Sequence, residues 1–211
     1  MTLGETALIA QRHITKMGSK KLSEFVEETG IVEIPKRYGE DQLLGLARIV
    51  ISQQLSNQAA RSIWDRLQVR FTERSELIKA LSDIETPDTG LSASKKRTLA
   101  TVLNLGESWI YHLSQIPENE RKEAMLAVNG VGPWTVSMWE LFVRRSSNQW
   151  ADNDLILKRI STEFATDAQL DRYKLIENAA PFRSYFALYC WRFNDQKNEG
   201  IRPVKQYDNL R

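Results

Sequence analysis

The sequence has one cysteine, Cys190, and two histidines, His13 and His112, among its 211 residues. One thiol cannot form a disulfide within the chain, and it cannot supply a four-cysteine zinc or iron–sulfur site. The two histidines lie far apart in the sequence, so we expect them at the surface or in packing rather than at a metal. These shortages argue against hydrolysis by a metal ion held on side chains.

Long apolar runs are also missing. No window of 18 consecutive residues is apolar, so we expect no membrane-spanning helix and no membrane partner. Residues 1–21 lack the basic, apolar and small-residue order of a secretory signal. Glycine and proline are sparse, at 10 and 6 residues, which excludes a collagen-like sequence. With 42% hydrophobic and 27% charged residues, the composition is that of a folded chain, and we expect a reduced, intracellular, soluble protein.

A strong charge of either sign is absent. The 29 Lys and Arg residues against 27 Asp and Glu leave a net charge of +2, which by itself does not indicate a nucleic-acid partner. Any contact with a polyanion must therefore come from a local basic patch or from oriented backbone amides. The strongest basic cluster is Lys95-Lys96-Arg97, near a predicted helix start. Contact of this cluster, Lys95 included, with a phosphate and a solvated helix face are equally compatible with the sequence.

Apolar residues recur at steps of three and four through most of the chain, which predicts an all-α protein. Between Asp41 and Phe71 this pattern is interrupted at residues 52–57, so we expect two helices there, the second capped by Ser56. Ser92 is the expected cap of the next helix. The remaining helices are predicted at 93–107, 117–128, 134–145 and 155–164, then from Thr166 and from Pro181 to Phe193, before a loosely held polar tail at 195–211.

Aromatic residues are concentrated in the C-terminal part of the chain. Residues 134–193 contain 12 of the 19 aromatic residues. We expect most of these rings to be core, as is usual for stripes of rings on helices, and the excess suggests a site lined with rings.

The most specific segment is Val128-Asn129-Gly130-Val131-Gly132-Pro133-Trp134-Thr135, which lies between two apolar helices. Gly130 and Gly132 permit left-handed backbone and a close approach to another part of the chain. The helix that follows presents N–H groups and partial positive charge at its N-terminus, which can hold a phosphate without a lysine. A simple tight connection between two helices explains the glycines equally well.

Three segments form an ordered set of motifs: Ile51-Ser52-Gln53-Gln54-Leu55-Ser56; Asn129 to Thr135 followed by Trp150-Ala151-Asp152-Asn153-Asp154; and Pro181 to Phe193. Together with Gly90-Leu91-Ser92 and Lys95, they span roughly Tyr38 to Asp195. In these motifs the chain resembles the helix-hairpin-helix DNA glycosylase superfamily and, within it, the 3-methyladenine DNA glycosylase II group.

The resemblance implies an all-helical body of two lobes, with DNA bound across a central cleft. The whole chain, 1–211, would be one glycosylase domain. Residues 1–40 and 165–211 would form one lobe, and residues 41–164 would form the lobe that carries the hairpin. Some relatives have an additional N-terminal mixed α/β domain, and this chain would be the compact form without it.

The resemblance also implies that the damaged base is rotated out of the duplex, at a cost of about a few kcal/mol. Leu55 would fill the gap as an apolar wedge, and Gln54 would contact the opposite strand. A core leucine at the end of a helix is the alternative for Leu55. Gly130, Gly132 and Thr135 of the hairpin would hold the DNA backbone.

Alkylated purines such as 3-methyladenine carry positive charge, which weakens the N-glycosidic bond. One carboxylate then suffices to stabilise the oxocarbenium-like sugar or to activate water. In the family's pattern Asp154 takes this role, and an ordinary helix N-cap is the alternative. Asp152 is expected at the surface or in the turn.

Four side chains are candidates for a base pocket. Trp134 and Trp191 fall where the family places pocket rings, and the face of an indole attracts a cationic base by about 0.5–2 kcal/mol. Tyr185 and Met138 are weaker candidates. Core packing is the alternative for all four.

The chain departs from some relatives at positions that carry chemistry. Trp134 stands where bifunctional members carry a Schiff-base lysine, so strand cleavage is not expected. The iron–sulfur cluster of many relatives cannot form with Cys190 alone, and no cofactor is required. Family hairpins often hold a monovalent cation, and the matching carbonyls of Leu126, Val128 and Val131 would bind a structural Na+ or K+ ion here.

We therefore expect a monofunctional DNA glycosylase, a DNA-3-methyladenine glycosylase II without lyase activity, that removes alkylated purines from damaged double-stranded DNA in base excision repair. It would act as a monomer, in the cytoplasm on the nucleoid of a bacterium or in the nucleus of a eukaryote. Two alternatives remain open. One is a non-catalytic module of the same fold that recognises abasic or distorted DNA, and the other is a helical protein-interaction domain.

Overall fold

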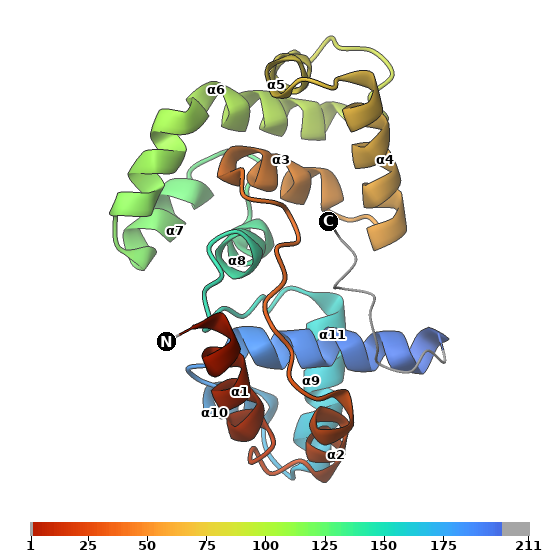
Figure 1. Ribbon diagram of the computed structural model, residues 1–211, viewed down its shortest axis with the longest axis vertical. Helices are drawn as coiled ribbons and strands as arrows, with labels where there is room; N and C mark the ends of the chain where they lie inside the picture. The colour runs from red at the N-terminus through yellow and green to blue at the C-terminus, as the bar shows by residue number, and fades with distance from the viewer. Residues whose placement is uncertain (1, 200–211) are drawn as a thin grey trace. The chain divides into compact units, whose positions relative to one another are not determined.

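The computed structural model describes residues 2–199, and within this range it contains α-helices and no strand (Figure 1). The predicted all-α class is confirmed. No helix of the described residues is long and apolar enough to cross a membrane. The helices are α1 Leu3–Ile14, α2 Lys20–Thr29, α3 Gln42–Ser52, α4 Asn57–Arg70, α5 Arg74–Ser82, α6 Ala93–Gln115, α7 Glu118–Leu126, α8 Pro133–Phe142, α9 Leu155–Asp167, α10 Arg172–Asn178 and α11 Arg183–Glu199.

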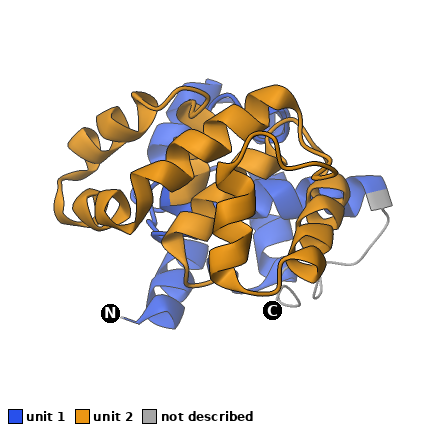
Figure 2. Ribbon diagram, turned by 90° about the horizontal axis from the view of Figure 1, so that it is seen from above, with its two compact units in different colours: residues 1–37, 140–211 blue, residues 38–139 orange. Residues whose placement is uncertain are grey.

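The chain divides into two compact units (Figure 2). Unit 1 comprises residues 1–37 and 140–211, and unit 2 comprises residues 38–139. The sequence-based division placed the second boundary at 164/165, whereas the structure places it within α8, so α9 and Asp154 belong to unit 1. α9 packs against α2, α10 and α11. The division that the resemblance implied therefore differs from the structure in residues 140–164, because α9 packs on helices of unit 1.

Unit 1 is built around α11. Every residue from Ser184 to Trp191 is buried, which is the pattern of a helix enclosed on all sides. The Phe186 ring stacks on Trp150 with centroids 5.3 Å apart, and the Phe164 and Phe193 rings lie 4.8 Å apart. Phe164 and Phe186 are buried in the core, whereas Trp150 and Phe193 are half-buried at its edge.

Unit 2 is built around α3, which packs against α4 and α6, while α5 and α7 pack on α6. The buried side chains of α3 include Leu43, Leu46 and Val50. The predicted caps are confirmed: the Ser56 hydroxyl accepts the N–H of Ala59 at the start of α4, and Ser92 caps α6.

Several predicted helix limits are wrong. α9 continues through Thr166 to Asp167, where a new helix was expected, and Asp171 caps the following helix instead. The Thr166 hydroxyl donates to the carbonyl of Thr162 one turn earlier, so this cap-type residue lies inside a helix rather than at its start.

Other elements end elsewhere or were missed. α8 ends at Phe142, three residues before its predicted end at 145, and α11 continues to Glu199 instead of stopping at Phe193. α6 extends past 107 through a kink at Gly106, which has a φ of 69°. α1, α2 and α5 were not among the predicted helices. Residues 200–211 of the predicted tail lie outside the described residues.

Candidate nucleic-acid interface and carboxylate site

The turn between α3 and α4 presents an apolar side chain to solvent. α3 ends at Ser52, Gln54 adopts left-handed backbone with a φ of 57°, and the N–H of Leu55 donates to the Ser52 carbonyl at 3.2 Å. Gln54 is exposed, and the Leu55 side chain is 38% exposed. That exposure contradicts the alternative of a core leucine. The contact of Leu55 and Gln54 with DNA stays a prediction.

The structure requires glycine at only one of the two hairpin positions, 130 and 132. Gly130 has a φ of +87°, and a Cβ added there would lie 1.9 Å from the Thr98 hydroxyl on α6. Gly132 has no left-handed backbone, and a Cβ there would meet nothing within 4 Å. The fold therefore needs glycine at 130 but not at 132. The sequence alone had assigned both glycines the same role.

The hairpin leads into α8 at Pro133, which has no N–H, so the first N–H groups of this helix are those of Trp134 and Thr135. Thr135, a predicted DNA contact, is only 1% exposed, and its hydroxyl accepts a hydrogen bond from the Gln53 side chain. This corrects the expectation for the Thr135 side chain, which the protein interior occupies. A contact of the helix N-terminus with DNA would be made by backbone amides.

Gln53 is a site residue that the sequence reasoning missed. Its side-chain Nε2 donates to the Gly130 carbonyl at 3.0 Å and to Thr135 Oγ1 at 2.8 Å. The polar run that interrupts the helical pattern at 52–57 was a signal for a turn. The partners, 77 and 82 residues further along the chain, were not readable from that run.

Lys95 holds the end of α3 instead of projecting into solvent. Its ammonium donates to the carbonyls of Ile51 at 2.6 Å and Gln53 at 2.7 Å. Burial lowers the pKa of Lys95 below its ordinary value. The last carbonyls of a helix carry partial negative charge and attract a cation, which is the physical reason for the placement. The expected phosphate contact of Lys95 is corrected accordingly.

Asp154 lies half-buried at the N-terminus of α9, where it was expected. Its Oδ1 accepts the N–H groups of Ile156 and Leu157, each at 3.0 Å, and the indole N–H of Trp191 on α11 at 3.4 Å. The carboxylate is therefore a helix N-cap whose orientation is set by donors from two helices.

The groups around Asp154 are not candidates for its role. Asp152 is exposed and forms an ion pair with Arg172 at 2.7 Å, which confirms the predicted surface role. Cys190 is fully buried, and burial, with the nearby charge of Asp154, raises the pKa of its thiol well above the ordinary value. Such a thiol is a poor nucleophile at neutral pH.

The predicted pocket residues are distributed over both units. Trp191 and Tyr185 belong to unit 1, where the Trp191 ring stacks on Phe142 with centroids 5.9 Å apart. Tyr185 is 1% exposed, and burial, with the charge of Glu33, raises the pKa of its hydroxyl. Trp134 is half-buried and Met138 is buried, both in unit 2. Their assembly into one base pocket stays a prediction.

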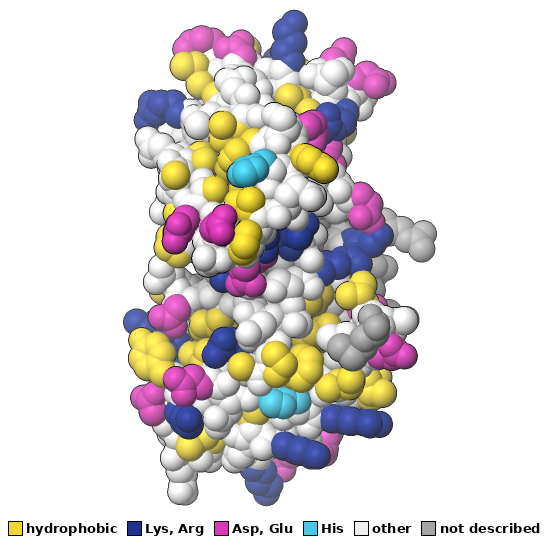
Figure 3. Space-filling view, turned by 90° about the vertical axis from the view of Figure 1, so that its left-hand side faces the viewer, with side chains coloured by type: hydrophobic (Ala, Val, Ile, Leu, Met, Phe, Trp, Pro, Cys, Tyr) yellow, Lys and Arg dark blue, Asp and Glu magenta, His cyan; other side chains and the backbone are white. Residues whose placement is uncertain are grey.

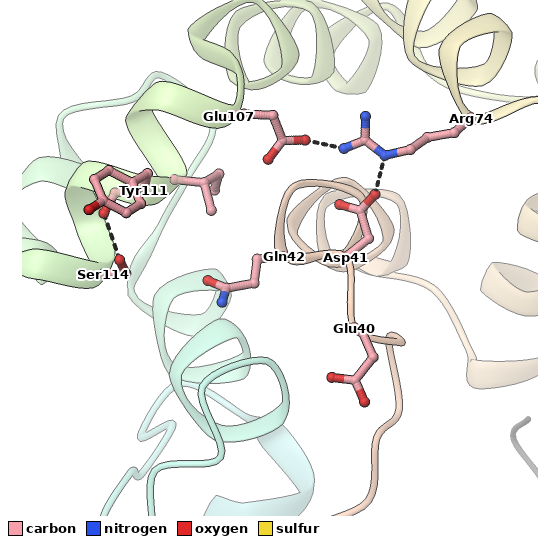
Figure 4. A pocket seen from close by; sticks show the side chains of 8 residues that line it. Glu40, Asp41, Gln42, Arg74, Glu107, Tyr111 and Ser114 are labelled. Carbon is pink, nitrogen blue, oxygen red and sulfur yellow. Dashed lines mark hydrogen bonds and ion pairs between the residues drawn. The ribbon is translucent and has the colours of Figure 1, made fainter.

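Unit 2 contains a pocket of about 560 Å³ whose lining is acidic (Figure 4). Arg74 on α5 bridges Asp41, at 2.5 Å, and Glu107 on α6, and Glu40 also lines the pocket. Three carboxylates against one guanidinium leave the lining with net negative charge, which disfavours a phosphate here. Because Asp41 also caps α3 through the N–H of Leu44, the cluster orients the helix that leads to the Leu55 turn.

The charges on one face and the possible metal ligands of the described residues bear on how the site could work. On the face shown in Figure 3, basic and acidic side chains are interspersed, in keeping with the net charge of +2. No group of three or more His, Cys, Asp or Glu side chains in residues 2–199 is placed to hold a metal ion. At the hairpin, the Val128 carbonyl accepts the N–H of Val131 at 3.0 Å, which leaves it a second lone pair.

Comparison with known proteins gives one consistent picture. No protein-family model matches the sequence. The chain is 23% identical over 204 residues to the alkylbase DNA glycosidase-like protein mag2 of Schizosaccharomyces pombe, a match that covers 90% of this chain and 95% of that protein.

Three solved structures share the fold. The 3-methyladenine DNA glycosylase Mag1 of Schizosaccharomyces pombe, in complex with abasic DNA, has a TM-score of 0.75 at 21% identity, over 93% of this chain and 100% of that chain. The DNA-3-methyladenine glycosidase of Bacillus halodurans has a TM-score of 0.69 at 23% identity, over 91% of this chain and 92% of that chain. The 3-methyladenine DNA glycosylase of Archaeoglobus fulgidus has a TM-score of 0.71 at 19% identity, over 92% of this chain and 70% of that chain.

Proposed function

We propose that this chain, which has the fold of the 3-methyladenine DNA glycosylases, is itself a monofunctional DNA glycosylase. It hydrolyses the N-glycosidic bond of alkylated purines such as 3-methyladenine in duplex DNA, and it acts as a monomer. The observation that carries the proposal is the Asp154 carboxylate, held in a defined orientation at the mouth of α9 beside the Trp191 indole.

The chemistry requires little beyond a correctly placed negative charge. An alkylated purine is a good leaving group because it already carries positive charge, so the barrier lies in the oxocarbenium-like sugar. A carboxylate stabilises that sugar electrostatically and can take a proton from the attacking water. Since the donors to Asp154 come from α9 and α11, the group needs little reorganisation when positive charge develops.

Recognition of the damaged base would rest on the indoles of Trp134 and Trp191. The face of a tryptophan attracts a cation by about 0.5–2 kcal/mol, more when water is excluded. A neutral purine gains less from the same surface. This difference favours charged, alkylated bases over normal ones.

The grip on DNA would come from backbone amides and an apolar wedge. Gly132 leaves open space beside the N-terminus of α8, so a phosphate can approach the amides there closely. Leu55 would enter the stack where the base has left it. Uncharged carbonyl ligands suit a monovalent ion, so we include a Na+ or K+ ion at Leu126, Val128 and Val131 in this proposal.

Strand cleavage is not part of the proposed activity. A glycosylase that cleaves the strand needs an amine that attacks the sugar and forms a Schiff base. Trp134 occupies the matching position after the hairpin, and an indole nitrogen cannot perform this attack.

One observation favours a second candidate, a non-catalytic module that binds abasic or distorted DNA. The two backbone hydrogen bonds of Asp154 are those of an ordinary N-cap, so a structural role explains them without catalysis.

Base release from methylated duplex DNA, resolved by chromatography, separates the two candidates. The glycosylase is expected to release 3-methyladenine under single-turnover conditions. Tight binding to an abasic analogue without any base release would favour the non-catalytic module. Failure to bind duplex DNA at low salt would contradict both.

A further inference from the structure

Hydrogen bonds hold both the side chain and the backbone of Gln53 to other elements of unit 2. Its side-chain amide donates to the Gly130 carbonyl in the hairpin and to the Thr135 hydroxyl in the first turn of α8. Its backbone carbonyl accepts from the ammonium of Lys95 on α6. The residue is half-buried, and the exposed pair Gln54 and Leu55 follows it directly.

The conformation of the turn depends on these attachments. Gln54 has a φ of 57°, a left-handed backbone that a glutamine adopts only at some expense of free energy. Such a conformation persists when neighbouring groups restrain it. The hydrogen bonds on Gln53, one residue earlier, restrain the turn from which Leu55 projects with 38% of its surface exposed.

The two acceptors of the Gln53 amide lie on either side of Gly132 and Pro133, where the hairpin ends and α8 begins. Gly130 lies before Gly132 and Thr135 lies after it, so one side chain joins the turn to both sides of the amides that would hold phosphate. These two hydrogen bonds tie the position of the turn to that of the hairpin.

We infer that Gln53 is a positioning residue that couples the hairpin's hold on the DNA backbone to the placement of the Leu55 wedge. The inference rests on the proposed contact of this fold with damaged DNA. Gln53 does not touch the reacting atoms; it sets where Leu55 enters the stack once the hairpin has bound. Glutamine suits this task because its NH2 group supplies two donors for two acceptors. Alanine supplies none, and glutamate would place an acceptor against the Gly130 carbonyl.

The test is a double-mutant cycle of Gln53→Ala with Leu55→Ala, read out in two ways. The first readout is the single-turnover rate of 3-methyladenine release. The second is the fluorescence of 2-aminopurine placed beside a tetrahydrofuran abasic analogue, which reports insertion into the stack even without catalysis. Gln115→Ala is the matched control, because it removes an exposed amide that donates to the Ser114 hydroxyl in the same unit. Thermal unfolding of each variant verifies that it is folded. If Gln53→Ala is not folded, Gln53→Met replaces it, because methionine keeps the length of the side chain and supplies no donor.

Gln53→Ala is expected to reduce release and the fluorescence change about tenfold, the scale of losing such hydrogen bonds, while binding to the abasic analogue weakens less than about threefold. In the Leu55→Ala background the same substitution should have an effect below about twofold, because the wedge it positions is gone. Additive losses would overturn the inference, as would equal losses in binding and insertion. If the wild-type protein releases no base, but Gln53→Ala reduces the fluorescence change relative to the wild-type protein, the glycosylase proposal fails and the coupling stands. If the wild-type protein releases base and Gln53→Ala releases it at the same rate, the glycosylase proposal stands and the coupling fails.

Discussion

The indole N–H of Trp191 donates to the same oxygen, Oδ1 of Asp154, that caps α9. The donor and acceptor are 3.4 Å apart, which is long for a hydrogen bond, and they come from helices that pack against each other in unit 1. The carboxylate is thus oriented by the start of its own helix and by the centre of α11. Trp191 therefore has a place in the site besides any contact between its ring and a base.

Asp154→Asn is expected to reduce single-turnover release of 3-methyladenine by orders of magnitude, because it removes the charge while keeping the shape and the cap. Binding to an abasic analogue should remain within about threefold, since neither the hairpin nor the wedge is altered. Asp152→Asn is the matched control. It breaks an exposed ion pair with Arg172 and should change the rate less than about threefold. Near-normal release by Asp154→Asn would show that the catalytic assignment is wrong.

The protein should release base without cutting the strand. Borohydride added during the reaction is expected to trap no covalent complex, because Trp134 provides no amine for a Schiff base. The abasic product should stay intact until alkali or heat is applied. A trapped protein–DNA adduct on a denaturing gel would identify a lyase and contradict this prediction.

Leu55→Ala is expected to slow base release by at least about tenfold while binding to undamaged duplex changes less than about threefold. The wedge is lost, but the backbone amides at α8 are unchanged. Because Leu55 is 38% exposed, the free energy of unfolding should fall by less than about 1 kcal/mol. An unchanged rate together with a loss of about 3 kcal/mol in urea unfolding would instead mark a core leucine.

The hairpin glycines should respond differently to alanine. Gly130→Ala places a methyl group against Thr98 in left-handed backbone, so we expect the free energy of unfolding to fall by more than about 2 kcal/mol. Gly132→Ala should change stability by less than about 1 kcal/mol and weaken binding to abasic DNA about fivefold, because the methyl group lies beside the helix N-terminus. Equal stability losses in urea unfolding would contradict the different structural roles of the two glycines.

The Arg74 cluster should contribute to stability in a pH-dependent way. Burial raises the pKa of Asp41, but hydrogen bonds from Arg74 and from the N–H of Leu44 outweigh burial, and the net pKa is lowered. A lowered carboxyl pKa contributes stability above the unfolded value of about 3.9, and this stability is lost as the pH falls through the folded pKa.

Arg74→Met should therefore destabilise the protein at pH 7 by less than about 1 kcal/mol, since the pair is partly exposed. It should also flatten the dependence of the free energy of unfolding on pH as the pH falls below about 4. Lys79→Met, at an exposed position of the same helix, is the control. An unchanged pH dependence in Arg74→Met would show that the Arg74 hydrogen bond is not the cause of the lowered pKa of Asp41.

The sequence by itself determined the features that depend on neighbours within one or two turns. The apolar period predicted helices, and the cap-type residues Ser56, Ser92 and Asp154 predicted where three of them begin, because a cap bonds N–H groups two or three residues away. The hairpin and the polar turn before Leu55 were recognisable for the same reason.

Only the tertiary structure decided which helices cover one another and what the polar side chains bind. Lys95 meets carbonyls more than 40 residues away, and the partners of Gln53 lie 77 and 82 residues from it. The need for glycine at 130 but not at 132 depends on Thr98, which belongs to another helix. The assignment of α9 to unit 1 follows from its packing on α11. Such pairings arise when distant segments exclude water together, and the local order of residues carries no record of them.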